Sequence, residues 1–135
     1  SMQFAETPPS EARPYTDLVY VLQGNANTGH WYINGEVFPE VTIEELPLGH
    51  DTMIEVRNIS SSEHPFHLHG HGFEVVARNG VRPQFRQMED TINVSIFETV
   101  LIRLIADNPG DWMLHCHIQT HQYGGMMTVL RVAGD

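Results

Sequence analysis

Short runs of β-forming residues, separated by turn signals, recur along most of this chain and constrain its fold more than any other feature. Several runs alternate apolar and polar residues, as in the segment "MIEVR" over residues 53–57. A period of two predicts strands that bury one face, and no amphipathic helix longer than a turn or two is evident. This spacing is typical of an antiparallel sandwich or a Greek-key barrel. We therefore expect a single all-β domain.

The expected strands share this alternation or a continuous apolar character. They lie within residues 17–24, 30–38, 42–46, 51–60, 64–80, 90–96, 98–107, 111–118 and 126–132. Pro47, Pro83 and Pro109 fall between these runs, where proline is tolerated.

The first residues have a different composition. Residues 3–16 are rich in proline and polar side chains, which is typical of a linker or of an arm that lies on something else. The Ser-Met start resembles a cloning scar. We therefore expect the scar and the linker or arm over residues 1–14, and one domain over residues 15–135.

Charge and hydropathy exclude some classes of partner. Seven Lys and Arg residues stand against seventeen Asp and Glu residues, which gives a formal charge of −10. This balance argues against binding to nucleic acid or to an anionic membrane. No apolar run approaches the ~20 residues that span a bilayer, and no signal peptide is visible. The single cysteine, Cys116, excludes an intrachain disulfide.

Two clusters hold seven of the nine histidines and the only cysteine. The first is "HPFHLHGHGF" over residues 64–73, and the second is "DWMLHCHIQTHQYGGMM" over residues 111–127. Alternate residues of a strand face opposite sides. Parity therefore predicts two separate sites on the two sides of one pair of strands. The apolar side offers His64 and Cys116, and the other side offers four histidines, namely His67, His69, His115 and His117.

The apolar side carries donors that suit copper. One thiolate, two imidazoles and a weak thioether form the blue-copper set. Cys116 and His64 supply two of its members, and a loop after the second strand could supply His121 and Met126. Gly124 and Gly125 would let that loop turn back tightly. Zinc also binds Cys and His, but zinc gives no reason for a close methionine or for a second histidine cluster.

The other side carries only imidazoles, which suit copper or zinc. Because His115 and His117 flank Cys116 directly, an electron on the Cys116 sulfur would have a covalent route to a metal held by those histidines. The position of the thiol between two imidazoles therefore predicts two metal sites that exchange electrons.

The two motifs, together with the lead-in "DNPGDWMLHCH", closely resemble the C-terminal cupredoxin domain of laccase-like multicopper oxidases. The resemblance covers roughly residues 15–133. It implies a Greek-key cupredoxin β-sandwich with copper as cofactor. It also implies a copper-dependent oxidoreductase, exported to the periplasm or beyond the cell, that oxidises phenols, aromatic amines or metal ions and passes the electrons to dioxygen.

Residue by residue, the resemblance assigns two sets of ligands. His64, Cys116 and His121 correspond to the type 1 copper ligands, with Met126 as the axial ligand. His67 resembles a type 2 ligand, whereas the type 3 ligands would be His69, His115 and His117. The residues expected to serve catalysis are Cys116, His115 and His117. In the family, the type 1 copper accepts electrons, and the type 2 and type 3 coppers form a trinuclear cluster that reduces dioxygen to water.

One departure from the family pattern limits the expected activity. The family completes its trinuclear cluster with two further His-x-His pairs from another cupredoxin domain, and this chain has only the isolated His30 and His50 to spare. We therefore expect a whole type 1 site and half of a trinuclear cluster, so that a lone monomer is inactive towards dioxygen. The missing histidines would come from another domain or chain.

Four interpretations remain open at this point. The chain could be an electron-transfer domain of a larger oxidase, a self-assembling oxidase whose copies meet through their histidines, a copper-binding or storage protein, or a relative of copper nitrite reductase. His71 is expected to be structural rather than a ligand, and Met127 to belong to the core. Asn58 and Asn93 stand in Asn-x-Ser sequons, a pattern that is common by chance.

Overall fold

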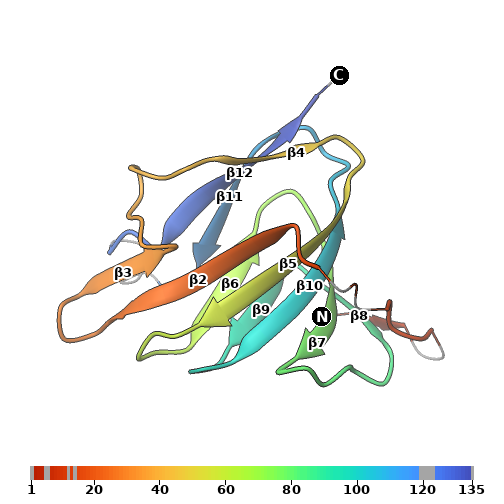
Figure 1. Ribbon diagram of the computed structural model, residues 1–135, viewed down its shortest axis with the longest axis horizontal. Coiled ribbons are helices and arrows are strands. Elements are labelled where there is room, and N and C mark those ends of the chain that lie inside the picture. Colours follow the sequence, from red (N-terminus) through yellow and green to blue (C-terminus); the bar gives the residue numbers. More distant parts are fainter. Residues whose placement is uncertain (1, 5–6, 12, 14, 119–123, 135) are drawn as a thin grey trace.

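The computed structural model describes residues 2–4, 7–11, 13, 15–118 and 124–134, and within them every regular element is a strand (Figure 1). The strands are β1 (Met2–Phe4), β2 (Leu18–Asn25), β3 (His30–Ile33), β4 (Glu44–Pro47), β5 (Asp51–Asn58), β6 (His64–Leu68), β7 (Phe73–Arg78), β8 (Arg86–Glu89), β9 (Thr91–Val94), β10 (Thr99–Ile105), β11 (Gly110–Cys116) and β12 (Met127–Ala133). No helix that could cross a membrane occurs in this described part of the chain.

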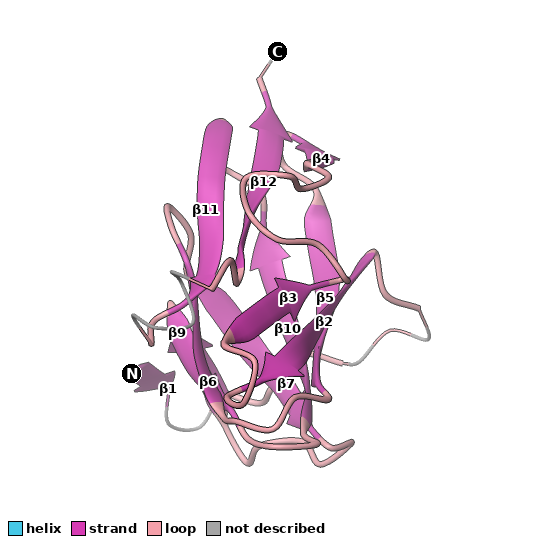
Figure 2. Cartoon of the chain, turned by 90° about the vertical axis from the view of Figure 1, so that its left-hand side faces the viewer, coloured by secondary structure: helices cyan, strands magenta, loops and turns pink. Residues whose placement is uncertain are grey.

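The strands form two sheets that pack face to face (Figure 2). The seven-stranded sheet has the order β1-β8-β7-β10-β5-β2-β3, and the five-stranded sheet has the order β4-β12-β11-β6-β9. Both sheets send apolar side chains into one shared core, for example Val56 and Ile102 from the first sheet and Phe66 and Leu130 from the second. The expected all-β sandwich is thereby confirmed.

Two pairs of strands run parallel, although the sequence predicts an antiparallel fold. β2 pairs with β5, and β4 pairs with β12, in parallel register. A parallel pair needs a connection that crosses between strands distant in sequence, so alternation within each strand could not reveal it. Pro47 is the last residue of β4, which is an edge strand. An edge is where a strand tolerates proline.

β1 and β8 are strands that the sequence pattern does not predict. All four residues of β8 are half-buried, so that strand shows no alternation of buried and exposed side chains. β1 lies within the expected linker or arm and pairs with β8 in antiparallel register. A second contact holds this N-terminal segment to the sandwich at Ser10. Its backbone N–H and hydroxyl donate to the buried carboxylate of Glu74 at 2.8 and 2.6 Å.

The register of β6 against β11 decides where the two motifs lie. Leu114 stands opposite Leu68, His115 opposite His67, and Cys116 opposite Phe66. Leu114 and Cys116 point into the core, and His115 points to the other side of the sheet. The pairing continues beyond the strand ends, because the His117 N–H donates to the Pro65 carbonyl at 2.7 Å. The two motifs therefore lie side by side, and the residues of each that face the core are on the same side of the sheet.

Candidate metal centre

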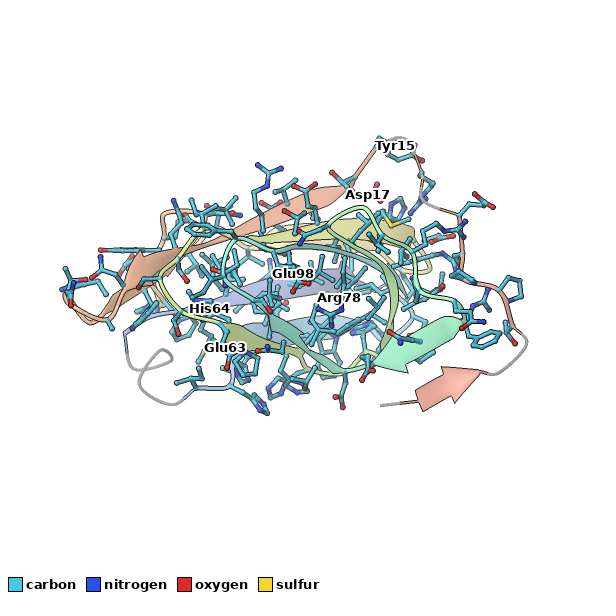
Figure 3. All side chains as sticks on the ribbon, turned by 90° about the horizontal axis from the view of Figure 1, so that it is seen from below. Tyr15, Asp17, Glu63, His64, Arg78 and Glu98 are labelled. Carbon is cyan, nitrogen blue, oxygen red and sulfur yellow. The ribbon has the colours of Figure 1, made fainter. Side chains whose placement is uncertain are left out.

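His64 and Cys116 meet inside the core, at the end of the sandwich where β6 begins and β11 ends. The Nδ1 atom of His64 lies 3.4 Å from the Sγ atom of Cys116, and neither residue is exposed to solvent. The Trp31 ring meets the His64 ring edge-on, with centroids 5.4 Å apart. Figure 3 shows His64 between the two layers of the fold. The expected pairing of these two donors on the apolar side is what the structure shows.

Met126 lies beside this pair. Its side chain is fully buried, and its backbone carbonyl accepts a hydrogen bond from the Cys116 N–H at 3.3 Å. The preceding Gly125 has a φ of +101°, and a Cβ atom there would come within 2.2 Å of Cγ1 of Val37. Glycine is therefore required where the chain turns back towards the core. His121, the remaining expected ligand, lies outside the described residues.

The second set of histidines gathers on the opposite side of the same strands. The His69 and His115 Nε2 atoms are 2.9 Å apart. The His67 ring centroid lies 4.7 Å from that of His69 and 4.9 Å from that of His117, and the His115 and His117 rings stack at 5.2 Å. Four imidazoles from residues expected to act together are thus brought into one patch. Of these rings, that of His115 is the most buried and that of His117 is exposed.

Backbone carbonyls fix the orientation of two of these rings. Nδ1 of His67 lies 2.8 Å from the Asp90 carbonyl oxygen, and Nδ1 of His115 lies 3.0 Å from the Cys116 carbonyl oxygen. A carbonyl oxygen only accepts hydrogen bonds, so each Nδ1 carries the proton in the neutral ring. The Nε2 atom of each ring is then left with a lone pair, which is the form of histidine that binds a metal.

Burial changes the ionisation of both sets. It lowers the pKa of His115 and of His69, and the neighbouring imidazoles lower it further. These rings are therefore kept neutral, as metal ligands must be. Burial also raises the pKa of Cys116 to about 11, against a smaller opposing effect of the Ile118 N–H that donates to Sγ. At this pKa the free thiol is protonated at neutral pH.

The two donor sets differ in their chemistry. Within the described residues, no group of three or more His, Cys, Asp or Glu side chains is arranged to hold a metal ion. The core set consists of a thiol, an imidazole and an adjacent methionine, a soft donor combination that fits copper. The surface set consists of imidazoles alone and is open to solvent on one side.

The remaining histidines have other surroundings. His71 is buried, with its ring edge-on to Trp112 at a centroid distance of 5.8 Å, and its Nδ1 atom lies 3.4 Å from the His69 carbonyl oxygen. His50 contacts Asp17 at 3.2 Å, and His30 stacks on Tyr32 at the exposed end of β3. Met127 is half-buried, whereas Met126 is completely buried.

Several contributors to the site were not visible in the sequence. Asp90 and Thr91 hold the His67 ring, and Ser60 contacts His64 at 2.6 Å. Asp90 and Thr91 belong to a different strand region from the histidine motifs. No spacing rule connects them with a histidine more than twenty positions away. Ser60 stands close to His64 in sequence, but serine is common in loops and carries no specific signal.

A buried thiol and imidazole on one side of a strand pair, with four imidazoles on the other, define a metal-binding β-sandwich of the cupredoxin class. The family model described as "Multicopper oxidase" matches residues 11–135. The chain therefore belongs to the multicopper oxidase family, whose cofactor is copper.

Individual relatives agree with this assignment. The chain is 37% identical to the multicopper oxidase MmcO of Mycobacterium tuberculosis over 117 residues, which are 87% of this chain and 23% of that protein. It is 36% identical to laccase-5 of Trametes villosa, covering 83% of this chain and 22% of that protein. The chain thus spans less than a quarter of the length of these relatives.

Solved structures show the same fold. The laccase of Pediococcus acidilactici superposes with a TM-score of 0.81 at 31% identity, covering 96% of this chain and 30% of that one. The multicopper oxidase of Campylobacter jejuni, described as a metallo-oxidase, gives a TM-score of 0.76 at 28% identity, covering 93% and 32%. The expected cupredoxin fold is confirmed.

Proposed function

We propose that this chain is the part of a laccase-like multicopper oxidase that binds a complete type 1 copper and contributes half of a trinuclear copper cluster. The observation that carries the proposal is the back-to-back placement of two donor sets on β6 and β11. His64 and Cys116 meet in the core at 3.4 Å, while His69 and His115 meet on the other side of the sheet at 2.9 Å.

The core set would hold the type 1 copper through His64 Nδ1, the Cys116 thiolate and His121, with Met126 as the axial donor. The buried position of His64, Cys116 and Met126 excludes water, and the Trp31 ring covers one edge of the imidazole. Burial raises the pKa of Cys116, so the free thiol is protonated, and copper binding would release that proton. Copper supplies a one-electron redox couple when it is bound.

The four-histidine patch would contribute to the second centre, with His67 as a type 2 ligand and with His69, His115 and His117 as type 3 ligands. His67 and His115 already present Nε2 lone pairs, since their Nδ1–H groups donate to carbonyl oxygens. Cys116 is covalently joined to His115 and His117, so the peptide backbone links the two sets. These three residues are the ones we propose for catalysis.

The patch requires a partner that brings more histidines. This partner would be another cupredoxin domain, either elsewhere in the same polypeptide or in a second copy of the chain. The shares of 23% and 22% that the chain covers in its relatives favour a domain of a longer polypeptide. The completed enzyme would oxidise a phenol, an aromatic amine or a metal ion one electron at a time, with dioxygen as the acceptor that is reduced to water.

Copper loading of the purified chain tests this proposal. We expect a blue product with a strong thiolate-to-copper charge-transfer band at one equivalent of copper, and we expect Cys116→Ser to lose that band because a hydroxyl is a poor soft donor. His67→Ala should keep the blue band, since His67 lies on the other side of the sheet. Strong blue absorption in Cys116→Ser, or none in the wild-type chain, would overturn the type 1 assignment.

The size of the protein in solution tests the half-cluster. Sedimentation and dioxygen consumption with a phenolic donor are measured on the same sample. We expect the monomer to accept an electron without consuming dioxygen, and we expect any oxidase activity to increase with assembly and to vanish in His117→Ala. Robust dioxygen reduction by a verified monomer would contradict the half-cluster.

A further inference from the structure

The loop between β5 and β6 contains a buried polar cluster around His64, and its other two members are not among the proposed metal ligands. It consists of Asn58 at the end of β5, Ser60 in the loop and His64 at the start of β6. Asn58 and His64 have no solvent exposure, and Ser60 is 2% exposed. The Ser60 Oγ atom lies 2.6 Å from Nε2 of His64, on the side of the ring away from Cys116.

The orientation of the Asn58 amide is fixed by its surroundings. Its Nδ2 atom lies 2.8 Å from the Ser62 carbonyl oxygen and 3.1 Å from each of the carbonyl oxygens of Val94 and Ser95. Only the NH2 end of the amide can face three acceptors. Its Oδ1 atom therefore points to Ser60, where it accepts from the backbone N–H at 2.9 Å.

This orientation decides where the single proton of the Ser60 hydroxyl goes. The Oγ atom lies 2.7 Å from Asn58 Oδ1 and 2.9 Å from the Ser62 carbonyl oxygen, and both of these atoms only accept hydrogen bonds. The hydroxyl proton must point to one of them, because otherwise three buried oxygens would face one another with no proton between them. Ser60 is left as an acceptor towards His64.

His64 must then donate from Nε2. A neutral imidazole carries one proton, so its Nδ1 atom has a lone pair, and that atom is the one facing Cys116. We propose that Asn58 and Ser60 are positioning residues that set the ring tautomer and the orientation of His64 before any metal arrives. The identity of the metal as copper rests on the proposed function. The assignment of the proton to Nε2 of His64 rests only on the hydrogen bonds described above.

Asn58 also stands in an Asn-x-Ser sequon. The Asn58 side chain ties the loop to the end of β9 through the carbonyls of Val94 and Ser95, and it is completely buried. A glycan would replace one of the two Nδ2 protons and would need space that this buried side chain does not have. In the folded chain, the Asn58 amide therefore serves the hydrogen bonds of the loop.

Long-range proton–nitrogen NMR of the histidine rings in the metal-free chain tests the proton assignment directly. We expect His64 of the wild-type protein to be protonated at Nε2. A proton on Nδ1 would overturn the inference, whatever the chain does with copper. In Ser60→Ala, we expect the Nδ1-protonated form to appear, and Ser60→Thr should restore the wild-type tautomer because it keeps the hydroxyl.

Copper-loaded protein gives a second readout, with Ser62→Ala as the matched control. The Ser62 hydroxyl donates only to the Glu63 carbonyl, at 3.1 Å, among the described contacts. We expect Ser60→Ala to shift the reduction potential upward, since an imidazole without an acceptor at Nε2–H donates less strongly to oxidised metal. Ser62→Ala should match the wild type. A blue wild-type protein whose potential is unchanged in Ser60→Ala would refute the positioning role alone, whereas a wild-type chain that never turns blue would refute the proposed function.

Discussion

Nδ1 of His64 lies 3.4 Å from Sγ of Cys116, although 52 positions separate the two residues in the sequence. The antiparallel pairing of β6 with β11 brings them together, with Phe66 opposite Cys116. The pair sits at the end of the sandwich, where both strands meet the loops that carry Ser60 and Met126. An ion bound there would therefore contact residues from two strands and from a loop.

Replacement of the buried methionine should change the potential without removing the colour. In Met126→Leu, we expect the charge-transfer band to persist and the reduction potential to rise, because the proposed axial donor, a weak one, is lost while the buried volume is nearly kept. Spectroelectrochemistry of the copper-loaded protein measures both. A lower potential would show that Met126 is not an axial donor.

Gly125→Ala should be destabilising and should also disturb the core metal site. The new Cβ would lie 2.2 Å from Val37 Cγ1 in a backbone with a φ of +101°. Gly80→Ala is the control, since its φ is +78° and nothing lies within 4 Å of a Cβ there. We expect Gly80→Ala to cost about 1 kcal/mol from backbone strain alone, and Gly125→Ala to cost more and to shift the copper spectrum. Equal losses and equal spectra would contradict the steric argument.

The buried carboxylate of Glu74 should contribute strongly to stability. It accepts two hydrogen bonds from Ser10 and lies 3.6 and 3.7 Å from the guanidinium groups of Arg86 and Arg103. Glu74→Ala removes the acceptor of the Ser10 N–H and the counter-charge of Arg86, whereas Arg103 keeps its two hydrogen bonds with Asp51. We therefore expect a loss of about 2 kcal/mol in urea unfolding. Glu11→Ala breaks the exposed ion pair with Arg82 and should have no measurable effect on stability.

The metal-free protein should lose stability in mild acid. Burial, together with the neighbouring imidazoles, lowers the pKa of His69 and His115 below the ordinary 6.5. The folded state therefore favours the neutral rings, so their contribution is present above pH 6.5 and is lost as the pH falls through the lowered pKa. Urea unfolding at pH 7.5, 6.5 and 5.5 should show a smaller decline in His69→Gln than in the wild type. His30→Gln, on the exposed end of β3, should decline like the wild type.

The free thiol should be unreactive in the folded, metal-free protein. Burial raises the pKa of Cys116 from 9.0 to about 11, so at pH 8 the thiolate fraction is about 100-fold lower than for an ordinary thiol. Alkylation by iodoacetamide, followed by mass spectrometry, should be slow at pH 8, faster towards pH 11, and fast at pH 8 once urea unfolds the chain. Rapid alkylation of the folded chain at pH 8 would contradict the buried position.

Sequence alternation alone was sufficient to predict most of the strands and the separation of the two donor sets. Parity works here because β6 and β11 are regular strands of one sheet, so Cys116 and His115 must face opposite sides. The parallel pairs could not be predicted, since they depend on which distant strands become neighbours. β8 was missed because uniform half-burial leaves no period in its residues.

The supporting residues of the site were equally hidden from sequence reasoning. Asn58 and Ser60 have their effect through hydrogen bonds whose direction depends on three carbonyl oxygens around one amide. Asp90 holds His67 through its backbone carbonyl, so the type of its side chain carries no signal of that contact. The ligand types follow from chemistry and spacing, whereas the groups that orient them follow only from the tertiary structure.

The immediate succession of His115, Cys116 and His117 limits how this domain can diverge. An insertion or deletion of one residue in β11 before His115 would turn the thiol towards solvent and the imidazoles towards the core, because a shift of one position exchanges the faces of a strand. Both donor sets would be lost through the same change, so the length of β11 before His115 is fixed by both sets together. Changes of length are therefore expected in loops, such as the one between β3 and β4, and not in β11.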